Sequence, residues 1–564
     1  MTAETKRLPG LTATHGRALV CLAFVLAAVL GLFLVDGCGI GVDEKTERRI
    51  LDVNIKAYAQ VLGGEDSALY QSLGDIPDID DYVERDHGQA QSYPVWPLMY
   101  LARQQDNMAA MENIYHMGLH LLFLLGLFGL YSIVRRLTGS RGAGLIGAAL
   151  LYGNPRFFAE SFYNNKDVAL MSLCLIVFWM GLRFVQENTW NSCILFGIAG
   201  AVAANTRALG LAAFGVCGLV YLADVTARRA WSRRAFLRGL AAVAAWLLAF
   251  VLLTPACWHD FFGFWQYYLG ATANFDAARW NGWFLYRGAV YNPTENPIPW
   301  HYIPWLMIIT TPLLILAAAA VLPVLAAVRC GKSRARWLST PMLFCMGLGL
   351  FALLPLGYAM LARPNLYNGW RHMYFIYGTV VIFAGLCLHG LWQSRRKWLR
   401  TALAAVLALH FVFYAGFIAL NHPNEFAYFN VLAGPHPEER YDADYWNIAQ
   451  YTVMDEMLAR DPAFSAVGRG GTSINWSWYT IKSTMPERFG EGSEEVTFDR
   501  RHRAKYILEN TSAWHTELLH PSMDPADPAV QEWIAVTDGL EPVMQVKCGR
   551  TVLWNVYENP LYQG

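Results

Sequence analysis

Charge is scarce in this chain, and what little there is cancels. Asp, Glu, Lys and Arg make up 16% of the 564 residues, against roughly 25% in soluble domains. The 44 basic residues balance the 44 acidic ones, which argues against a nucleic-acid partner. The ten cysteines form no CxxC pair, so the sequence indicates neither a disulfide framework nor a zinc site. Internal repeats and low-complexity tracts are also lacking.

Hydrophobic residues, by contrast, make up 55% of the chain. They gather in apolar runs close to the roughly 20 residues that cross a bilayer. We predict a polytopic α-helical membrane protein with about eleven spans, the first a retained anchor rather than a cleaved signal. The predicted spans are 17–35, 114–134, 142–156, 168–186, 192–206, 208–224, 238–255, 303–328, 340–361, 372–392 and 402–420. The third, fifth and sixth are short.

Clusters of Lys and Arg predict the orientation of the bundle. They fall near residues 135–141, 228–234, 329–336 and 395–400. With eleven spans and a cytoplasmic N-terminus, all four clusters lie on the cytoplasmic side, as the positive-inside rule requires. The C-terminus is then extracytoplasmic.

Two domains follow from this topology: a transmembrane module over 1–420 and a small extracytoplasmic α/β domain over 421–564. The module carries external loops at 36–113 and 256–302. The C-terminal domain is expected to hold a helix near 443–460 and strands at Lys505–Leu508, Val543–Val546 and Thr551–Val556.

The two external loops each have a distinctive pattern. In the first, apolar residues from Ile50 to Val61 recur at helical spacing beside charged ones. This pattern fits either an amphipathic helix on the membrane surface or a helix packed on the loop's own core. The second loop is rich in aromatics, including Trp258, Trp265 and Trp280. An interfacial belt is the ordinary interpretation, with sugar stacking or a lipid groove as the alternative.

Charged residues at the outer ends of spans are the candidates for chemistry, because charge near a membrane is costly and often functional. They are Asp43, Glu44, Arg156, Glu160, Lys166, Asp167, Arg207, Arg363, Arg371 and His372. Arg156 and Arg363 equally fit side chains that snorkel to the interface. Glu160 is better interpreted as a simple loop charge.

Such a set of acids and bases suits transfer of a sugar from a lipid phosphate. A carboxylate, Asp43 or Glu44, would deprotonate or orient the acceptor hydroxyl. Cations such as Arg371, Arg207 and Lys166 would bind the phosphate and stabilise it as it leaves.

Four stretches resemble the GT-C superfamily of integral-membrane glycosyltransferases, particularly its protein O-mannosyltransferase-like branch, glycosyltransferase family 39 and its bacterial relatives. They are Asp43-Glu44 after the first span, Asn154 to Asp167, Asn368 to Tyr374, and Asn421 to Asn430. The resemblance covers about residues 17–450. It implies a GT-C fold in a bacterial inner membrane.

The resemblance also implies roles. The reaction would be an inverting transfer from a polyprenyl-phosphate-linked monosaccharide to an acceptor outside the membrane. Asp43 would be the catalytic base, supported by Glu44, with Asp167 as a second acid. Arg371 would bind the lipid phosphate, for which His372, Arg207 and Lys166 are further candidates.

The stretch after the last span supplies the candidates for acceptor or sugar binding: Glu425, Tyr428 and Asn430. A role in docking the C-terminal domain is the stronger alternative for them. Farther on, Tyr441, Asp442, Asp444 and Trp446 fit either sugar contacts or the start of a helix. No cofactor and no metal ligand is assigned, although carboxylates leave room for a divalent metal. The expected partners are the lipid-linked donor, membrane lipids and an acceptor protein, lipid or glycan.

Other classes of function compete with this one. A transporter or flippase for a lipid-linked or anionic solute would also span the membrane, but usually shows paired repeats and mid-membrane charges. A non-catalytic scaffold with an external binding domain leaves the charges at the span ends unexplained. An oligosaccharide transferase ranks lower because the chain has no WWD-type motif.

Overall fold

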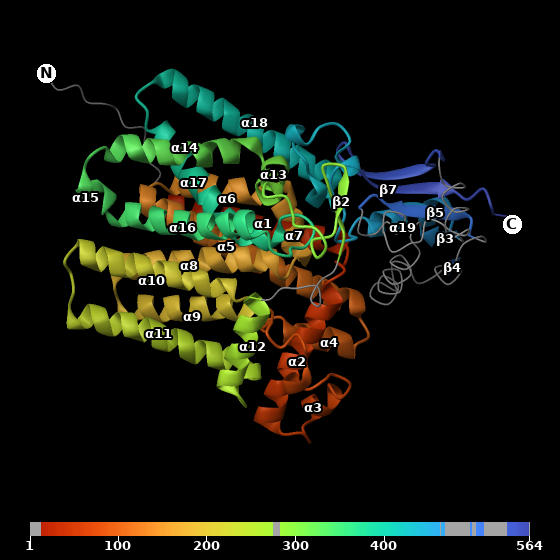
Figure 1. Ribbon diagram of the computed structural model, residues 1–564, viewed down its shortest axis with the longest axis horizontal. Helices are drawn as coiled ribbons and strands as arrows, with labels where there is room; N and C mark the ends of the chain where they lie inside the picture. Colours follow the sequence, from red (N-terminus) through yellow and green to blue (C-terminus); the bar gives the residue numbers. More distant parts are fainter. Residues whose placement is uncertain are drawn as a thin grey trace.

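The computed structural model describes residues 13–273, 282–462, 464–468, 497–498, 504–512 and 539–562. Within these ranges, nine helices are long and apolar enough to cross a membrane. They are α1 (Ala13–Leu34), α5 (Met108–Thr138), α8 (Asp167–Glu187), α10 (Leu209–Ala227), α11 (Arg233–Leu253), α14 (Leu313–Cys330), α16 (Thr340–Ala362), α17 (Tyr374–Trp392) and α18 (Lys397–Asn421). They lie side by side as one bundle (Figure 1). The predicted polytopic helical membrane protein is confirmed.

The count of spans differs from the predicted eleven because two of the predicted spans form shorter helices. They are α6 (Arg141–Tyr152), with 12 residues, and α9 (Trp190–Thr206), with 17 residues. At about 1.5 Å per residue, α6 covers about 18 Å of a hydrocarbon core about 30 Å thick. The predicted span 303–328 is also broken, into α13 (Tyr302–Thr310) and α14. Pro312 lies at the break and has no N–H to continue the helical ladder.

The basic loops gather at one end of the bundle, and the strands gather at the other. In Figure 1, α15 (Arg334–Trp337) and the loop between α10 and α11 lie at the left, while the C-terminal strands lie at the right. The ends of α5, α14 and α17 also meet around one shallow pocket that includes Arg329 and Arg336. This arrangement is the one that the positive-inside argument assumed.

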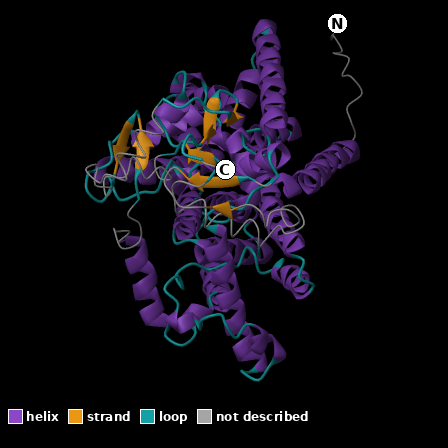
Figure 2. Ribbon diagram, turned by 90° about the vertical axis from the view of Figure 1, so that its right-hand side faces the viewer, coloured by secondary structure: helices purple, strands orange, loops and turns teal. Residues whose placement is uncertain are grey.

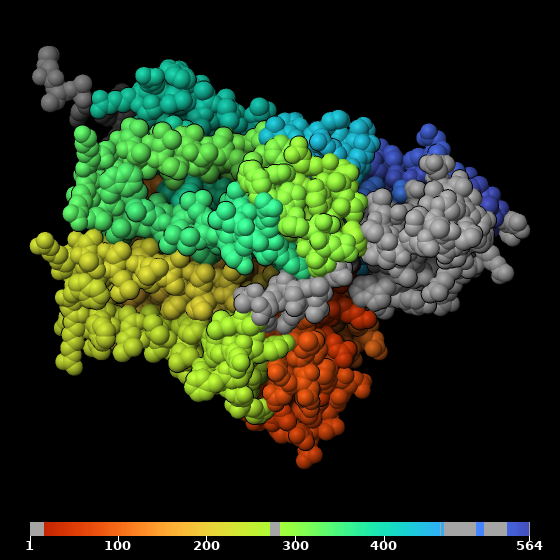
Figure 3. Space-filling view, viewed as in Figure 1, coloured from red at the N-terminus to blue at the C-terminus, as the bar shows by residue number. Residues whose placement is uncertain are grey.

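The first external loop forms η1 (Val35–Gly37), α2 (Glu44–Gly63), α3 (Ala68–Ser72), η2 (Ile79–Asp81) and α4 (Trp96–Gln104). Of the two interpretations of α2, the helix on the membrane surface is wrong, because α2 is largely buried in protein. Its apolar face packs inward through Ile50, Leu51 and Val53, and most of its charged residues are buried as well, whereas Lys45 and Arg49 are exposed. Figure 3 shows this loop, in red, against the segment that includes α12 (Phe261–Ala273).

The remaining helices and strands on the side predicted to be external are short. They are α7 (Pro155–Tyr163), η3 (Pro255–Cys257), β1 (Phe284–Tyr286), β2 (Ala289–Tyr291) and η4 (Arg371–Met373). The aromatic second loop is only partly a belt, since Phe264 and Tyr268 are buried in a core cluster while Phe262 is exposed. Trp280 lies outside the described residues.

After α18 the chain runs through η5 (Glu425–Ala427), η6 (Val431–Ala433) and η7 (Pro437–Glu439). It then forms α19 (Gln450–Arg460), β3 (Ser465–Gly468), β4 (Thr497–Phe498), β5 (Tyr506–Asn510), β6 (Met544–Cys548) and β7 (Thr551–Glu558).

The C-terminal strands form one mixed sheet in the order β4-β3-β5-β7-β6. β3 pairs in parallel with β4 and β5, whereas β7 is antiparallel to β5 and β6. The three predicted strands are β5, β6 and β7. The predicted helix begins later than expected, at Gln450, so Tyr441 to Trp446 precede it. Figure 2 shows the strands gathered over this end of the molecule.

Candidate functional site

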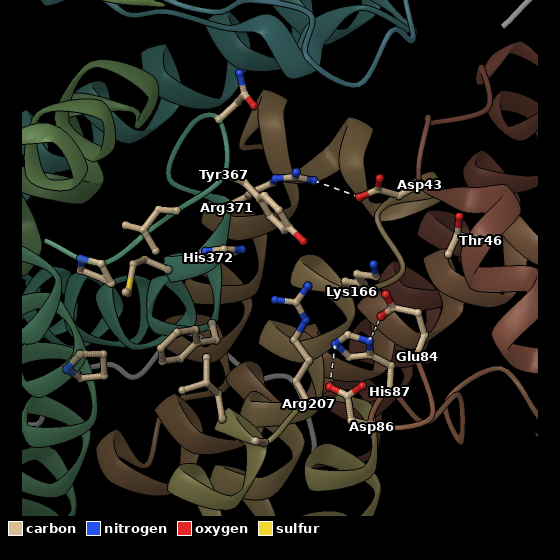
Figure 4. A pocket seen from close by; sticks show the side chains of 18 of the residues that line it. Asp43, Thr46, Glu84, Asp86, His87, Lys166, Arg207, Tyr367, Arg371 and His372 are labelled. Atoms are coloured by element: carbon tan, nitrogen blue, oxygen red, sulfur yellow. Dashed lines mark hydrogen bonds and ion pairs between the residues drawn. The ribbon is translucent and has the colours of Figure 1, made fainter. Parts of the chain in front are cut away.

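A cavity of about 470 Å³ opens at the end of the bundle that is predicted to be external. Its walls come from segments far apart in the chain: the first external loop, the starts of α8 and α10, the end of α16, and the loop that leads into α17. Figure 4 shows the charged side chains that enter it.

Asp43 and Arg371 face each other across this cavity (Figure 4). Asp43 is the residue before α2, and Arg371 begins η4. An Nη1 atom of Arg371 lies 3.2 Å from Oδ2 of Asp43. The two residues are 328 positions apart in the chain, and the packing of the bundle brings together the predicted base and the predicted phosphate-binding residue.

Lys166 and Arg207 add two further cations to the cavity wall. Lys166 precedes α8 and pairs with the buried Glu47. Arg207 ends α9 and lies 3.3 Å from Asp167, through Nη1 and Oδ1. Asp167 itself is buried behind Arg207 and does not line the cavity. Its position suits holding Arg207 in place better than contacting a substrate.

These charges set the protonation states at the site. Burial acts to raise the pKa of Asp43, but Lys166, Arg371 and Arg207 more than offset it and lower that pKa below its usual value. Burial lowers the pKa of Lys166 to about 8, with Asp43 acting in the opposite direction. At neutral pH the site therefore holds an ionised carboxylate among cations.

Aromatic rings surround the guanidinium of Arg371. The guanidinium lies 4.2 Å from the ring centre of Tyr367, 4.6 Å from Trp446 and 5.8 Å from Tyr445. His372, a predicted phosphate ligand, also lines the cavity, and its ring packs against Tyr367. Such faces attract a cation and exclude water, so they fix the direction in which Arg371 points.

A second group on the cavity wall, Glu84, Asp86 and His87, had no specific signal in the sequence. Ligand atoms of all three lie within 4.8 Å of one another. His87 Nδ1 already lies 2.8 Å from a carboxylate oxygen of Glu84. Two carboxylates and an imidazole form a donor set that divalent cations accept. The only hint in the sequence was the acidic character of the loop.

Glu44, the expected helper of Asp43, does not line the cavity. Its carboxylate turns into the protein, where Oε2 lies 2.7 Å from Nε2 of His116. Arg48 pairs with Glu112 in the same place, and all four side chains are buried. We call Glu44, Arg48, Glu112 and His116 the buried cluster. It ties α2 to α5.

The candidates for acceptor binding also lie away from the cavity lining. Glu425 pairs with His422 at 2.9 Å, and Tyr428 shares a hydrogen bond with Tyr414. Asn430 donates to the carbonyls of Ile308 and Thr311, between α13 and α14. These contacts fit the alternative role of docking the segment after α18 against the bundle.

Arg156 and Glu160 contradict their expected exposure. Both are buried, with an Arg156 Nη1 atom 3.5 Å from a Glu160 carboxylate oxygen. The hydroxyl of Tyr374 donates to Glu160 at 2.9 Å and lies 3.3 Å from that of Tyr445. Burial raises the pKa of Glu160 to about 7, against the opposing effect of Arg156. Glu160 is therefore not a simple loop charge, because α7, which carries both residues, is buried along its whole length.

Comparison with known proteins gives one family match and several distant structural likenesses. Residues 113–259 match the family described as dolichyl-phosphate-mannose-protein mannosyltransferase. The comparison with curated proteins gave no significant match.

Two of the similar solved structures are those of ArnT from Cupriavidus metallidurans. The apo form is 14% identical over 97% of this chain and 99% of that one, with a TM-score of 0.44. The form bound to undecaprenyl phosphate is 13% identical over 98% and 100%, with a TM-score of 0.44. The arabinofuranosyltransferase AftD from Mycobacteria is 13% identical over 96% of this chain and 40% of its own, with a TM-score of 0.38.

The family match begins within α5 and runs through α11 to the residues after η3. It therefore includes Lys166, Asp167 and Arg207, and it confirms the resemblance expected from the sequence. Over these residues the chain is similar to the dolichyl-phosphate-mannose-protein mannosyltransferase family.

Proposed function

We propose that this protein transfers a monosaccharide from a polyprenyl-phosphate donor to a hydroxyl of an extracytoplasmic acceptor, with inversion at the anomeric carbon. The observation that carries the proposal is the ion pair between Asp43 and Arg371 inside the external cavity. It places a candidate base 3.2 Å from a candidate phosphate-binding residue.

The cavity has two unlike walls, which suits an amphiphilic donor. One wall carries the cations Lys166, Arg207 and Arg371. The other is apolar and comes partly from membrane helices: Leu209, Pro355, Tyr358, Met373 and Phe375. A phosphate would be held by charge-assisted hydrogen bonds on the first wall. A prenyl chain would lie along the second wall and extend toward the bilayer.

Charge competition connects donor binding to the base. In this structure, Asp43 forms an ion pair with the guanidinium of Arg371. A donor phosphate would compete for that guanidinium and loosen the Asp43 carboxylate from it. The carboxylate would then be free to accept a proton from the acceptor hydroxyl, and its proton affinity would rise as the cation turns to the phosphate.

The transfer itself is a single displacement. The acceptor oxygen, as Asp43 takes its proton, forms a bond to the anomeric carbon. The bond between that carbon and the phosphate oxygen breaks on the opposite face. The lipid phosphate leaves with the electron pair, and Arg371, Arg207 and Lys166 stabilise its charge. Displacement from the opposite face inverts the anomeric centre.

A divalent metal is an open part of this proposal. Glu84, Asp86 and His87 would hold it at the edge of the cavity, where it would add positive charge for a phosphate. Lys166, Arg207 and Arg371 already supply such charge in the cavity, so the transfer does not demand a metal.

We further propose that the membrane is a bacterial inner membrane, with the N-terminus in the cytoplasm and the cavity outside. The basic loops support this orientation because they lie at the end of the bundle opposite the C-terminal strands (Figure 1). The acceptor is a protein, lipid or glycan, and the described part of the C-terminal domain reaches the cavity through Tyr445, which lines it.

The test is an assay of the purified protein with a panel of polyprenyl-phosphate sugars, with and without EDTA. We expect release of polyprenyl phosphate and a product of inverted configuration, both lost in Asp43→Asn. If EDTA abolishes transfer and a divalent cation restores it, the metal belongs to the site. Solute uptake into proteoliposomes, with no glycosyl product from any donor, would instead indicate the transporter.

A further inference from the structure

One short segment, Tyr441 to Trp446, joins the C-terminal domain to the cavity. It follows η7 and precedes α19, so in sequence it is the entry to the domain. All six of its residues are buried. Its contacts run in two directions, to the cavity on one side and to the sheet on the other.

Trp446 makes the contacts toward the cavity without lining it. The face of its indole lies 4.6 Å from the guanidinium of Arg371. Its backbone carbonyl accepts a hydrogen bond, at 3.2 Å, from the amide N–H of Val42, next to Asp43. Trp446 therefore contacts Arg371 directly and also holds Val42, the residue before Asp43.

The indole of Trp446 interacts through its ring face rather than through its N–H group. The side chain is buried, yet Nε1 has no hydrogen-bond partner among the described residues. Burying an unsatisfied donor destabilises a fold. The contact with Arg371 gives a reason for that placement, because the ring face attracts a cation strongly when water is excluded.

Asp444 makes the contacts toward the sheet. Its Oδ2 accepts a hydrogen bond from Nε1 of Trp554 in β7, at 2.9 Å. Its backbone N–H donates to Oγ of Ser512, at 2.8 Å, and its carbonyl accepts from Nδ2 of Asn510 at the end of β5. The position of Trp446 is therefore fixed by two strands of the C-terminal sheet.

We propose that Trp446 is a positioning residue that holds Arg371 and the backbone at Val42, next to Asp43, in place relative to each other. The C-terminal sheet, through Asp444, holds Trp446 in place. The C-terminal domain then completes the donor phosphate site rather than merely adjoining it. This inference rests on the proposed function for the identity of the ligand, a polyprenyl phosphate. The geometry it describes does not depend on sugar transfer.

The first test measures binding of farnesyl phosphate to the full-length protein in detergent, with no sugar and no turnover. We expect Trp446→Leu to bind about tenfold more weakly, the effect of losing one desolvated cation–π contact. Trp446→Phe keeps the ring face and omits the unsatisfied N–H, so it should bind within about twofold of the wild type. Trp300→Leu, at an exposed tryptophan outside the cavity, is the matched control and should bind normally.

The second test follows hydrogen exchange of the backbone near Val42. Trp446→Leu and Trp554→Phe should both speed exchange there, because each loosens the carbonyl that accepts from Val42. The control for the sheet is Asn555→Ala, the next residue of β7, whose side chain bonds Gln545 and Glu509 instead. It should leave exchange at Val42 unchanged.

The two tests separate this inference from the proposed function. If the wild type binds farnesyl phosphate but transfers no sugar, the proposed function fails while the Trp446 variants still decide the inference. If the wild type binds no farnesyl phosphate, the exchange at Val42 decides it alone. Normal binding and normal exchange in Trp446→Leu, or a loss in Trp446→Phe equal to that in Trp446→Leu, would overturn the positioning role.

Discussion

Asp43 and Glu44 are neighbours in the chain, yet their carboxylates belong to two different clusters. Asp43 is 32% exposed and faces Arg371 in the cavity. Glu44 is 2% exposed and faces His116 and Arg48 inside the protein. The difference arises at the start of α2, where successive side chains point about 100° apart around the helix axis. Two adjacent acids can therefore lie in different surroundings, one in the cavity where we propose the chemistry occurs and one in a buried ion-pair cluster.

The largest effect should come from Asp43→Asn. The amide keeps the size of the side chain but cannot take the acceptor proton, so transfer should fall by about 10²- to 10⁴-fold. Donor binding should survive, because Arg371, Arg207 and Lys166 are untouched. Single-turnover transfer and farnesyl phosphate binding, measured on the same preparation, check both halves. A variant that fails to bind the donor would show that Asp43 acts in binding instead.

The buried cluster should respond in stability rather than in chemistry. Glu112→Ala removes the closer of the two carboxylates that pair with the buried Arg48, which should cost about 3–5 kcal/mol in the free energy of unfolding. Thermal unfolding in detergent measures this. Glu187→Ala is the control, because Glu187 and its ion-pair partners Arg136 and Arg183 are all partly exposed. It should cost less than about 1 kcal/mol. Equal losses in the two variants would remove the distinction between the clusters.

Arg371→Gln should act on donor affinity. A charge-assisted hydrogen bond to phosphate supports an expected loss of about 10- to 100-fold in farnesyl phosphate binding. Arg363→Gln supplies the comparison, since Arg363 is exposed just after α16 and does not line the cavity. Its binding should match the wild type. Equal weakening in both would point to general surface charge rather than to a phosphate site.

The smallest effect should be that of pH on Lys166. Its pKa is lowered to about 8, so the amine is cationic at pH 7 and loses its proton as the pH rises toward 9. Farnesyl phosphate binding should weaken over that window by less than about tenfold, and Lys166→Met should flatten the dependence. Asp43 stays ionised throughout, because its pKa is lowered from its usual value. A pH dependence that persists in Lys166→Met would assign it to another group.

Much of the bundle could be predicted because apolar runs of bilayer length dictate helices whatever their neighbours are. The predictions were wrong where length and pattern alone could not decide. The residues of α6 are apolar but too few to cross the membrane, and Pro312 divides one predicted span. The pattern of α2 fitted either a helix on the membrane surface or one packed on the loop's own core, and only the ion pairs with Arg103, Lys166 and Glu112 show that most of its charges face protein.

The site was predictable where residues sat at the mouths of spans, as Asp43 and Arg371 do. It was not predictable where a loop had to fold back. Glu84 and His87 lie about 40 residues beyond Asp43 in the chain, and no spacing rule brings them to the same wall. Nor could the sequence say which carboxylate of Asp43-Glu44 faces the cavity, since that depends on how α2 is rotated against α5. The contact of Trp446 with Arg371 could not be predicted, because it depends on how the C-terminal sheet packs against the residues before α19.

The most direct test compares Asp43→Asn with Glu44→Gln in single-turnover sugar transfer, with each rate divided by the amount of folded protein. The division of labour predicts a loss of at least about 100-fold for Asp43→Asn. It predicts a rate within about tenfold of the wild type for Glu44→Gln, together with a lower unfolding temperature. Equal losses per folded molecule, or full activity in Asp43→Asn, would contradict it.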